Sequence, residues 1–391
     1  MIPSASRLTT ATILGRVIGR RLLSRLILPQ AGPDHAAFRD QMARATGATP
    51  NGLIAESSYL YLDAKTPPWI DTGIDLPAGT TVTTIGMGRV YLSKLLDVYS
   101  GPEYALWARV GGRGEIIDGT RDTNTFTTES GGRLYLATLT GEWRDKTGAL
   151  ATRAEDYAKA AGGISIQIVV WTDNAVRGLE SLAAHGDVNG LVADEIDRLL
   201  HAKPKPEGWE FLWFLGRSEI YSDSVTARGE PSIHCHTRQN VGILQKPAPF
   251  DLTPQTRLEW IWKVDALPSQ YAECTLPTHD YMSIAVEFDN GQDLTYYWSR
   301  ALPVETCYRC PLPAWNHRET HLVVRSGQRG LGQWLCESRN VYEDCRKAYG
   351  EAPRKIVQVW LIAVSLLQRL EGVCDYKDIR LTDGVNTLKI A

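Results

Sequence analysis

Short runs of alternating apolar and polar residues, separated by glycine-rich turns, constrain the fold of this chain more than any other feature. In the first half of the chain these runs cover residues 80–85, 104–110, 124–128, 134–138 and 164–171. Glycine pairs at 111–112, 131–132 and 162–163 separate them at hairpin-like intervals. Because side chains alternate between the two faces of a strand, this period predicts strands with one buried face. We therefore expect an antiparallel β-sandwich in this half.

The second half repeats the pattern after a break in composition. Residues 201–208 read His-Ala-Lys-Pro-Lys-Pro-Glu-Gly, which is typical of a linker. Further runs follow at residues 209–215, 232–236, 257–264, 281–288, 294–299, 321–324 and 356–364, with one short helix at 339–349. The predicted fold is mainly β, with two antiparallel, jelly-roll-like sandwiches behind a short N-terminal helical segment. The predicted boundaries are 1–57 for the helices, 58–200 for the first sandwich, 201–208 for the linker and 209–391 for the second sandwich.

The N-terminal segment is predicted to contain a basic amphipathic helix. Residues 1–30 hold five arginines, and Leu14, Ile18, Leu22 and Leu26 recur at every fourth position. The arginines interrupt the apolar run, which is far shorter than the ~20 residues that a membrane span needs. Docking of these leucines on the protein itself is the favoured interpretation, and attachment to an anionic membrane surface or a partner groove is the alternative. A second helix is expected at residues 34–46, and another at 190–200.

Charge and cysteine content restrict the partners and the compartment. The 391 residues include 42 Lys and Arg against 45 Asp and Glu, a formal net charge of −3, which argues against nucleic-acid binding by bulk electrostatics. All seven cysteines lie at or after Cys235, and their odd number excludes a complete disulfide framework within one chain. With no cleavable secretory pattern at the N-terminus, we predict a cytoplasmic protein, with peripheral membrane contact as the alternative. A homo-oligomer is compatible with these data.

Titratable residues gather in the second sandwich and suggest acid–base chemistry. The sequence contains no GxGxxG, Walker A, HExxH or GxSxG motif, so a site without a cofactor is favoured. Asp280 and Glu287 are the predicted acid–base pair, because two carboxyls in unlike environments can divide the two roles. The other predicted catalytic residues, as sources of the second proton carrier, are His236, Tyr281 and Cys274. The alternative is that Asp280 and Asp344 are structural partners of Arg300 and Arg339.

Aromatic side chains supply the predicted substrate-binding surface. Residues Trp262, Tyr296, Trp298 and Trp143 offer flat apolar faces of the kind that stack on sugars or apolar rings. The alternative is that these rings fill the sandwich cores, and we expect this for at least two of the tryptophans 260, 262, 298 and 334.

A metal site is the less favoured reading of the histidines and cysteines. His234 and His236 share one face of a predicted strand, and Cys307 and Cys310 have a spacing that could complete a zinc site. Cys274 and His279 lie between these two pairs in the sequence. We favour no metal, because an isolated CxxC pair also arises by chance.

The first half resembles the galactophilic PA-IL-like lectin family over residues 61–171. The resemblance rests on Asp71-Thr-Gly-Ile-Asp-Leu76, Ala105-Leu-Trp-Ala-Arg-Val-Gly111 and Gly132-Arg-Leu-Tyr-Leu-Ala137. It implies a sugar bound through calcium in the loop that follows the last of these segments. That loop has Glu142 and Asp145 here but no Asn, which puts the calcium site in doubt.

The second half resembles the bacterial family called domain of unknown function 3047. The matching blocks include Leu258-Glu-Trp-Ile-Trp-Lys-Val-Asp-Ala-Leu-Pro268, Thr295-Tyr-Tyr-Trp-Ser299 and Arg339-Asn-Val-Tyr-Glu-Asp344. The resemblance implies a fold more than a function. A polar segment of that family is replaced here by the more apolar residues 365–372, which favours a partly apolar ligand.

Together these features favour an acid–base enzyme, a lyase, dehydratase-isomerase or hydrolase, acting on a small hydroxylated, partly apolar substrate. The substrate is expected in the second sandwich or at the interface of the two domains. The alternative is a carbohydrate-binding protein without catalytic activity.

Overall fold

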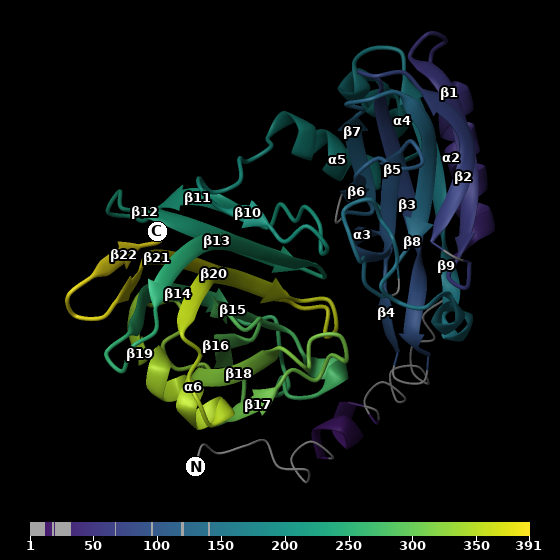
Figure 1. The fold of residues 1–391 in the computed structure, drawn as a ribbon. Coiled ribbons are helices and arrows are strands. Elements are labelled where there is room, and N and C mark those ends of the chain that lie inside the picture. The colour runs from purple at the N-terminus through teal and green to yellow at the C-terminus, as the bar shows by residue number, and fades with distance from the viewer. Residues whose placement is uncertain are drawn as a thin grey trace. The chain divides into compact units, whose positions relative to one another are not determined.

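The computed structural model describes residues 12–17, 19, 33–66, 68–94, 97–118, 121–139 and 141–391. The described residues divide into two compact units, one within residues 23–202 and one of residues 203–391 together with residues 12–17 and 19 (Figure 1). We call them the N-terminal unit and the C-terminal unit. The division falls inside the predicted linker. Most of the predicted basic helix lies outside the described residues, which include a helical stretch at residues 12–17 that contains Leu14.

Two antiparallel sheets form the N-terminal unit, and their inner faces enclose one apolar core. One sheet has the order β1-β9-β3-β4 with β7 also paired to β3, and the other has the order β2-β8-β5-β6. Leu62, Val82, Leu106, Leu136 and Ile166 lie in the core between them. The strands are β1 (Ile54–Asp63), β2 (Trp69–Leu76), β3 (Thr81–Ser93), β4 (Val98–Ser100), β5 (Leu106–Val110), β6 (Ile116–Asp118), β7 (Thr123–Thr127), β8 (Gly132–Thr138) and β9 (Ala161–Trp171).

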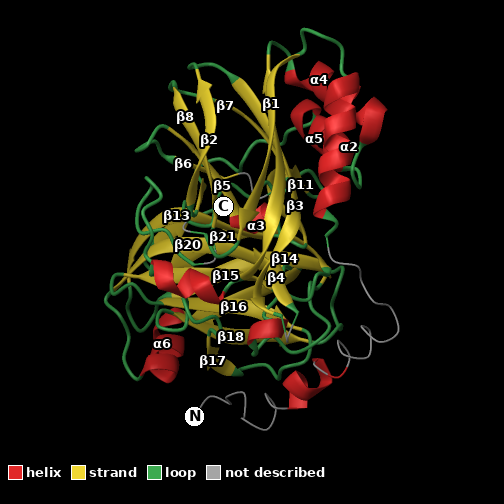
Figure 2. Cartoon of the chain, turned by 90° about the vertical axis from the view of Figure 1, so that its right-hand side faces the viewer, coloured by secondary structure: helices red, strands yellow, loops and turns green. Residues whose placement is uncertain are grey.

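Helices α2 (His35–Ala48), α4 (Ala175–Gly186) and α5 (Leu191–Leu200) pack beside one of these sheets, as Figure 2 shows. A second apolar cluster joins them to β3 and β9 through residues such as Phe38, Trp171 and Leu179. Asp34 caps α2 by accepting from the Ala37 N–H, and Asn174 caps α4 by accepting from the Arg177 N–H. The short helix α3 (Pro102–Ala105) and the 3₁₀ helix Ala154–Lys159 lie in connections.

The C-terminal unit is a sandwich of two larger sheets. The seven-stranded sheet has the order β10-β13-β20-β15-β16-β18-β17, and the six-stranded sheet has the order β11-β12-β21-β14-β19 with β22 paired to β21. All pairings are antiparallel except that of β16 with β18. The strands are β10 (Glu210–Phe211), β11 (Tyr221–Val225), β12 (Pro231–Arg238), β13 (Val241–Asp251), β14 (Arg257–Ala266), β15 (Tyr281–Phe288), β16 (Asp293–Ser299), β17 (Cys307–Arg309), β18 (Glu319–Ser326), β19 (Leu335–Asn340), β20 (Lys355–Val364), β21 (Glu371–Thr382) and β22 (Thr387–Lys389), with helix α6 (Val341–Tyr349) and the 3₁₀ helix Leu276–Thr278.

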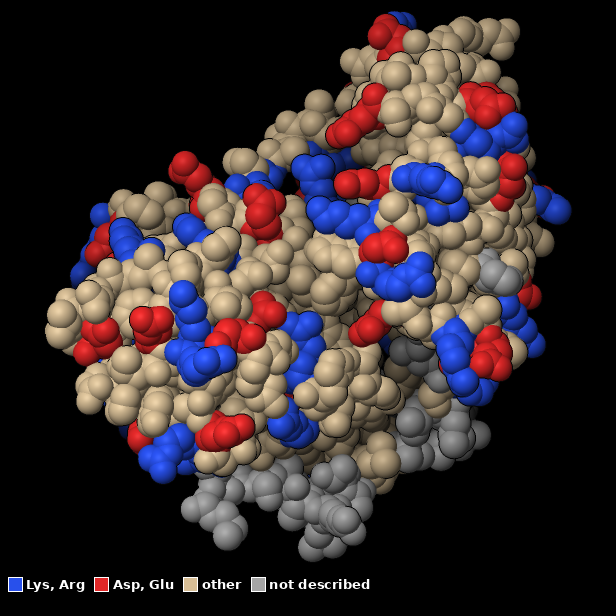
Figure 3. All heavy atoms as spheres, in the orientation of Figure 1, with Lys and Arg blue, Asp and Glu red and all other residues tan. Residues whose placement is uncertain are grey.

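The molecule is therefore mainly β, with antiparallel sheets arranged as sandwiches, as the alternating runs predict. On the face shown in Figure 3, basic and acidic side chains are interspersed, in keeping with the near balance of charges in the sequence. No helix among the described residues is both long enough and apolar enough to cross a membrane.

Candidate metal centre

The outer face of the seven-stranded sheet, turned away from the apolar core, carries buried polar side chains. On β15 the residues 282, 284, 286 and 288 enter the core, so Ser283 and Glu287 face outward. The same alternation places Asp293 and Thr295 of β16, and Glu319 and His321 of β18, on this outer face. The side chains of Asp293, Thr295, Glu319 and His321 are at most 2% exposed. Burial of so many polar groups has a cost that direct contacts among them must offset.

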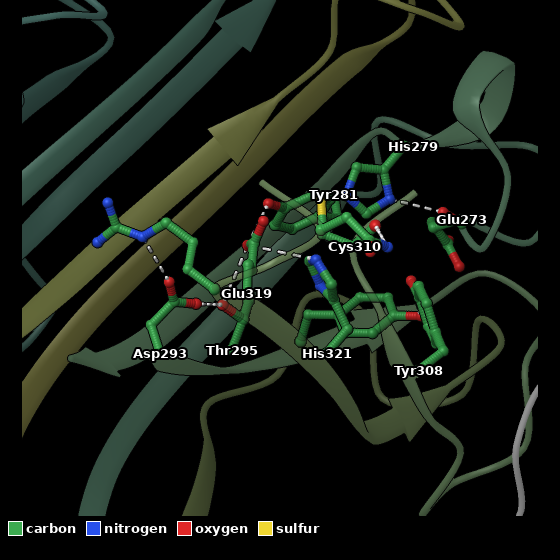
Figure 4. A network of polar contacts seen from close by, with 12 residues as sticks. Glu273, His279, Tyr281, Asp293, Thr295, Tyr308, Cys310, Glu319 and His321 are labelled. Atoms are coloured by element: carbon green, nitrogen blue, oxygen red, sulfur yellow. Dashed lines mark hydrogen bonds and ion pairs between the residues drawn. The ribbon is translucent and has the colours of Figure 1, made fainter. Parts of the chain in front are cut away.

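Two of these residues, Glu319 and His321, converge on one point with two further buried groups, His279 and Cys310. His279 precedes β15, Cys310 follows β17, and Glu319 and His321 lie two positions apart on β18. One possible ligand atom from each residue lies within 4.8 Å of those of the other three, and all four residues are buried. Figure 4 shows these side chains pointing toward one another from three separate segments. We call this group the His279 cluster.

Two close contacts define the geometry of the His279 cluster. Cys310 Sγ lies 3.3 Å from His279 Nε2, and His321 Nε2 lies 3.2 Å from Glu319 Oε1. Neither ring nitrogen of His321 makes a well-formed hydrogen bond to the described part of the chain, although the residue is 0% exposed. Buried polar atoms are normally hydrogen-bonded, so the ring nitrogens of His321 retain the capacity to bind a ligand.

Neighbouring groups orient two of the four side chains. His279 Nδ1 lies 2.7 Å from the main-chain carbonyl of Glu273, so Nδ1 carries the proton and the lone pair of Nε2 faces Cys310. Glu319 Oε1 accepts hydrogen bonds from the Tyr281 hydroxyl at 3.0 Å and from the Thr295 hydroxyl at 3.2 Å. Such outer contacts fix the direction in which metal ligands present their donor atoms.

The protonation states follow from burial and from the neighbouring groups. Burial, with a smaller effect of His321, lowers the pKa of His279 to about 3, so its ring is neutral at pH 7. Burial alone would raise the pKa of Glu319, but His321 and His279 lower it to about 2. Burial, followed by the charge of Glu319, raises the pKa of Cys310, which keeps it a thiol in the absence of a cation.

This set of donors suits a divalent transition metal ion, and zinc in particular. Zinc binds imidazole nitrogen and carboxylate oxygen at about 2.0–2.2 Å and thiolate sulfur at about 2.3 Å, usually with four ligands. A cation would also favour loss of the Cys310 proton. One thiolate and one carboxylate would then balance a doubly charged ion, which satisfies the requirement that buried charges be compensated.

The predicted metal candidates divide between two distant parts of the C-terminal unit. His234 and His236 do share a face of β12, but this strand belongs to the six-stranded sheet. There His234 contacts Asp375 at 2.8 Å and His236 contacts Glu371 at 2.6 Å. Cys307 is half-buried against the sandwich core, so Cys310 alone of these four lies in the His279 cluster.

The predicted catalytic residues are not gathered into one site. The Asp280 carboxylate is buried and accepts from the N–H groups of Leu367 and Gln368 at 2.9 and 2.5 Å. Asp280 is thus an anchor for the loop after β20. Glu287 forms an ion pair with Arg318 at 3.2 Å, and His236 lies on β12 of the six-stranded sheet. Cys274 is buried in the segment before β15. Tyr281 contacts the His279 cluster by donating a hydrogen bond to Glu319.

Of the two structural ion pairs weighed from the sequence, one is present. Arg339 pairs with Asp344 at 2.7 Å, whereas Asp280 binds main-chain groups instead of Arg300.

The predicted substrate-binding aromatics lie in the interiors of the two units. Trp262, Tyr296 and Trp298 are at most 1% exposed and belong to the core of the C-terminal sandwich. Trp143 is 4% exposed and stacks on Trp69 with ring centroids 5.2 Å apart. All four rings therefore pack against other parts of the protein, and a role in substrate binding stays a prediction.

The loop suspected of holding calcium is built as a turn. The Asp145 carboxylate accepts from the Thr147 main-chain N–H at 3.0 Å and from the Thr147 hydroxyl at 2.6 Å. Asp residues commonly close turns in this way, so the carboxylate is already engaged with its own loop.

Glu319 and His321 supply two of the four donors, and neither was predicted from the sequence. The signal in the sequence is the alternation Glu319-Thr320-His321, which puts both side chains on one face of a strand. It was obscured because the run expected as this strand, residues 321–324, begins after Glu319 and Thr320, so the side chains of Glu319 and His321 were not placed on one strand.

One family model matches part of the chain. Residues 207–380 match the model of a family described as Protein of unknown function (DUF3047). This match covers most of the second sandwich, including the His279 cluster, and the family description names no activity. No curated protein matches the chain.

Parts of several solved structures are similar to this chain, with low TM-scores. The N-terminal domain of EclA, a PllA-like lectin, is 20% identical, with 31% of this chain and 99% of that chain covered and a TM-score of 0.24. The xyloglucanase domain of NopAA from Sinorhizobium fredii is 7% identical, with coverages of 46% and 95% and a TM-score of 0.26. The CBM22-1-CBM22-2 tandem domain of Paenibacillus barcinonensis Xyn10C is 11% identical, with coverages of 85% and 92% and a TM-score of 0.22. At these scores the likenesses carry no argument about function.

Proposed function

We propose that the C-terminal unit binds one divalent metal ion, with zinc the best match, between His279, Cys310, Glu319 and His321. The observation that carries the proposal is the convergence of two imidazoles, one thiol and one carboxylate within 4.8 Å in the protein interior. The proposal departs from the expectation of a protein without a cofactor.

The enclosure of the site favours an ion that holds the structure together. Structural zinc sites use four protein ligands, whereas catalytic sites leave one position for water or substrate. Here four donors are available and all are buried. The ion would tie the segment before β15 and the end of β17 to β18. It would thus join His279 to Cys310, 31 residues further along the chain, and to His321, 42 residues further along.

Metal content of the full-length protein tests the proposal. The protein is purified without added metal or chelator, dialysed against equimolar zinc, passed through a desalting column and measured by inductively coupled plasma mass spectrometry. We expect about one zinc per chain in the wild type, and much less in Cys310→Ser and His321→Ala, because each variant removes one donor. Cys307→Ser is the matched control, since this thiol lies three residues away and outside the cluster. Zinc below a tenth of an equivalent in the wild type, or full retention in both donor variants, would contradict the proposal.

Acid–base catalysis on a hydroxylated substrate is the second candidate function. It rests on the titratable residues predicted in the second sandwich, of which Tyr281 donates a hydrogen bond to Glu319 at 3.0 Å beside the His279 cluster. Carbohydrate binding without catalysis remains its alternative. Turnover of chromogenic glycosides and esters by the wild type, lost in Tyr281→Phe, would support catalysis, whereas equal rates in both proteins would exclude this residue.

A further inference from the structure

Glu273 connects the sheet to one of the cluster residues. It lies in residues 267–280, the segment between β14 and β15, and its side chain is fully buried. Its carboxylate accepts three hydrogen bonds: from the Ser299 hydroxyl at 2.6 Å, from the Arg300 N–H at 2.7 Å and from the Ser269 hydroxyl at 2.7 Å. Two of these donors stand at the end of β16, so the side chain fastens the segment to the seven-stranded sheet.

The main-chain carbonyl of Glu273 contacts the His279 ring. The carbonyl oxygen of Glu273 lies 2.7 Å from Nδ1 of His279, and Figure 4 shows this contact beside the cluster. The side chain of Glu273 therefore sets where this carbonyl stands, and the carbonyl in turn sets the tautomer and the direction of the His279 ring.

We infer that Glu273 is a positioning residue for the metal ion: it holds the Nε2 atom of His279 toward Cys310 without being a ligand itself. This inference rests on the proposed metal-binding function. Loss of an outer-shell partner of a metal ligand typically lowers metal affinity about 10- to 100-fold. Glu273→Gln should have an effect of this size, although it leaves all four donors in place.

The physical reason lies in the donors that surround the carboxylate. An amide offers one oxygen and one NH₂ group, and the NH₂ group must then face a donor. The Arg300 N–H cannot act as an acceptor, and the Ser299 oxygen already accepts from the N–H groups of Ala301 and Leu302 at 3.2 and 2.9 Å. One hydrogen bond is therefore lost, and the stretch from residue 273 to 279 must shift.

Other contacts keep this segment folded in the variant. The Gln368 side chain accepts from the N–H groups of Gln270 and Tyr271, and its Nε2 donates to the Thr278 carbonyl at 2.7 Å. The change should thus alter the orientation of His279 more than the fold.

Cobalt titration of the full-length protein tests the inference, because cobalt(II) reports affinity through its visible bands and reports the sulfur ligand through a thiolate charge-transfer band. We expect Glu273→Gln to bind cobalt about 10- to 100-fold more weakly than the wild type while keeping the thiolate band at saturation. The matched control is Glu195→Gln in the N-terminal unit, a buried Glu that also accepts from a main-chain N–H and should leave cobalt affinity unchanged. Ser299→Ala removes one of the three hydrogen bonds and serves if Glu273→Gln does not fold.

The outcomes separate this inference from the proposed function. Wild-type affinity in Glu273→Gln, or in Ser299→Ala where the former does not fold, would overturn the positioning role and leave metal binding intact. Absence of cobalt bands in the wild type itself would overturn the metal centre and the inference together. A fall in affinity of equal size in Glu195→Gln would also overturn the inference, because it would show a general effect of destabilisation.

Discussion

Zinc should raise the melting temperature of the C-terminal unit by an amount that follows from its size and from a single site. A ligand that binds only the folded state stabilises it by about 2.7 kcal/mol at 100 times its dissociation constant. For a unit of the size of residues 203–391, about 1 kcal/mol corresponds to roughly 2–4 °C. We therefore expect a rise of about 5–11 °C when the zinc concentration is raised from zero to this level.

Differential scanning calorimetry of metal-free protein with added zinc measures this shift. Cys310→Ser should lose most of the shift, because the only thiol of the cluster is removed, whereas Cys307→Ser should keep it. The reasoning is refuted if the wild type shows no shift at saturating zinc, or if Cys310→Ser shows the same shift as the wild type.

Three further predictions concern stability. Asp280→Asn should lower the free energy of unfolding in urea by about 1–3 kcal/mol, because one loop N–H would then face an amide NH₂ group. The control Asp289→Asn, in an exposed loop, should lower it far less. Equal urea midpoints for the two variants would contradict this prediction. Trp262→Ala should cost about 3–5 kcal/mol by the same assay, since the ring is fully buried, and a loss below about 1 kcal/mol would show that the ring is not a core element. Burial, followed by Asp122, raises the pKa of Glu103 well above its usual value, so the stability that this carboxyl contributes at acid pH is lost as the pH rises through its folded-state pKa. Between about pH 5 and 9 the urea midpoint should therefore fall less steeply with rising pH in Glu103→Gln than in the wild type. Parallel curves for the two proteins would show that the ionisation of Glu103 does not affect stability.

Strands with strict alternation were predictable from the sequence. Residues 281–288 were expected as one strand and form β15 with the same bounds, because every second side chain enters the apolar core. By contrast, the apolar run 209–215 was expected as a strand, yet only Glu210–Phe211 pairs in a sheet. Trp209, Leu212 and Leu215 are buried from irregular backbone instead. A short apolar run indicates that its residues are buried, but it does not show whether their backbone forms a strand.

The candidate metal centre shows the same limit. Cys310 and His279 were recognised as metal-type residues, because their side-chain chemistry is visible in the sequence. The histidines that were considered with them, His234 and His236, lie on β12 in the other sheet. Nothing local in the sequence distinguishes His236 from His321 on β18. Glu319 and Thr320 are buried polar residues at the start of β18, and hydrophobic patterning does not detect such positions. Only the pairing of β15, β16, β18 and β17 brings the four donors together.

Zinc K-edge X-ray absorption on the zinc-loaded protein tests the central claim most directly. The proposed centre predicts four ligands: one sulfur at about 2.3 Å, and three nitrogen or oxygen donors at about 2.0–2.2 Å with the scattering pattern of imidazole. A first shell without sulfur, or a spectrum that Cys310→Ser leaves unchanged, would contradict it.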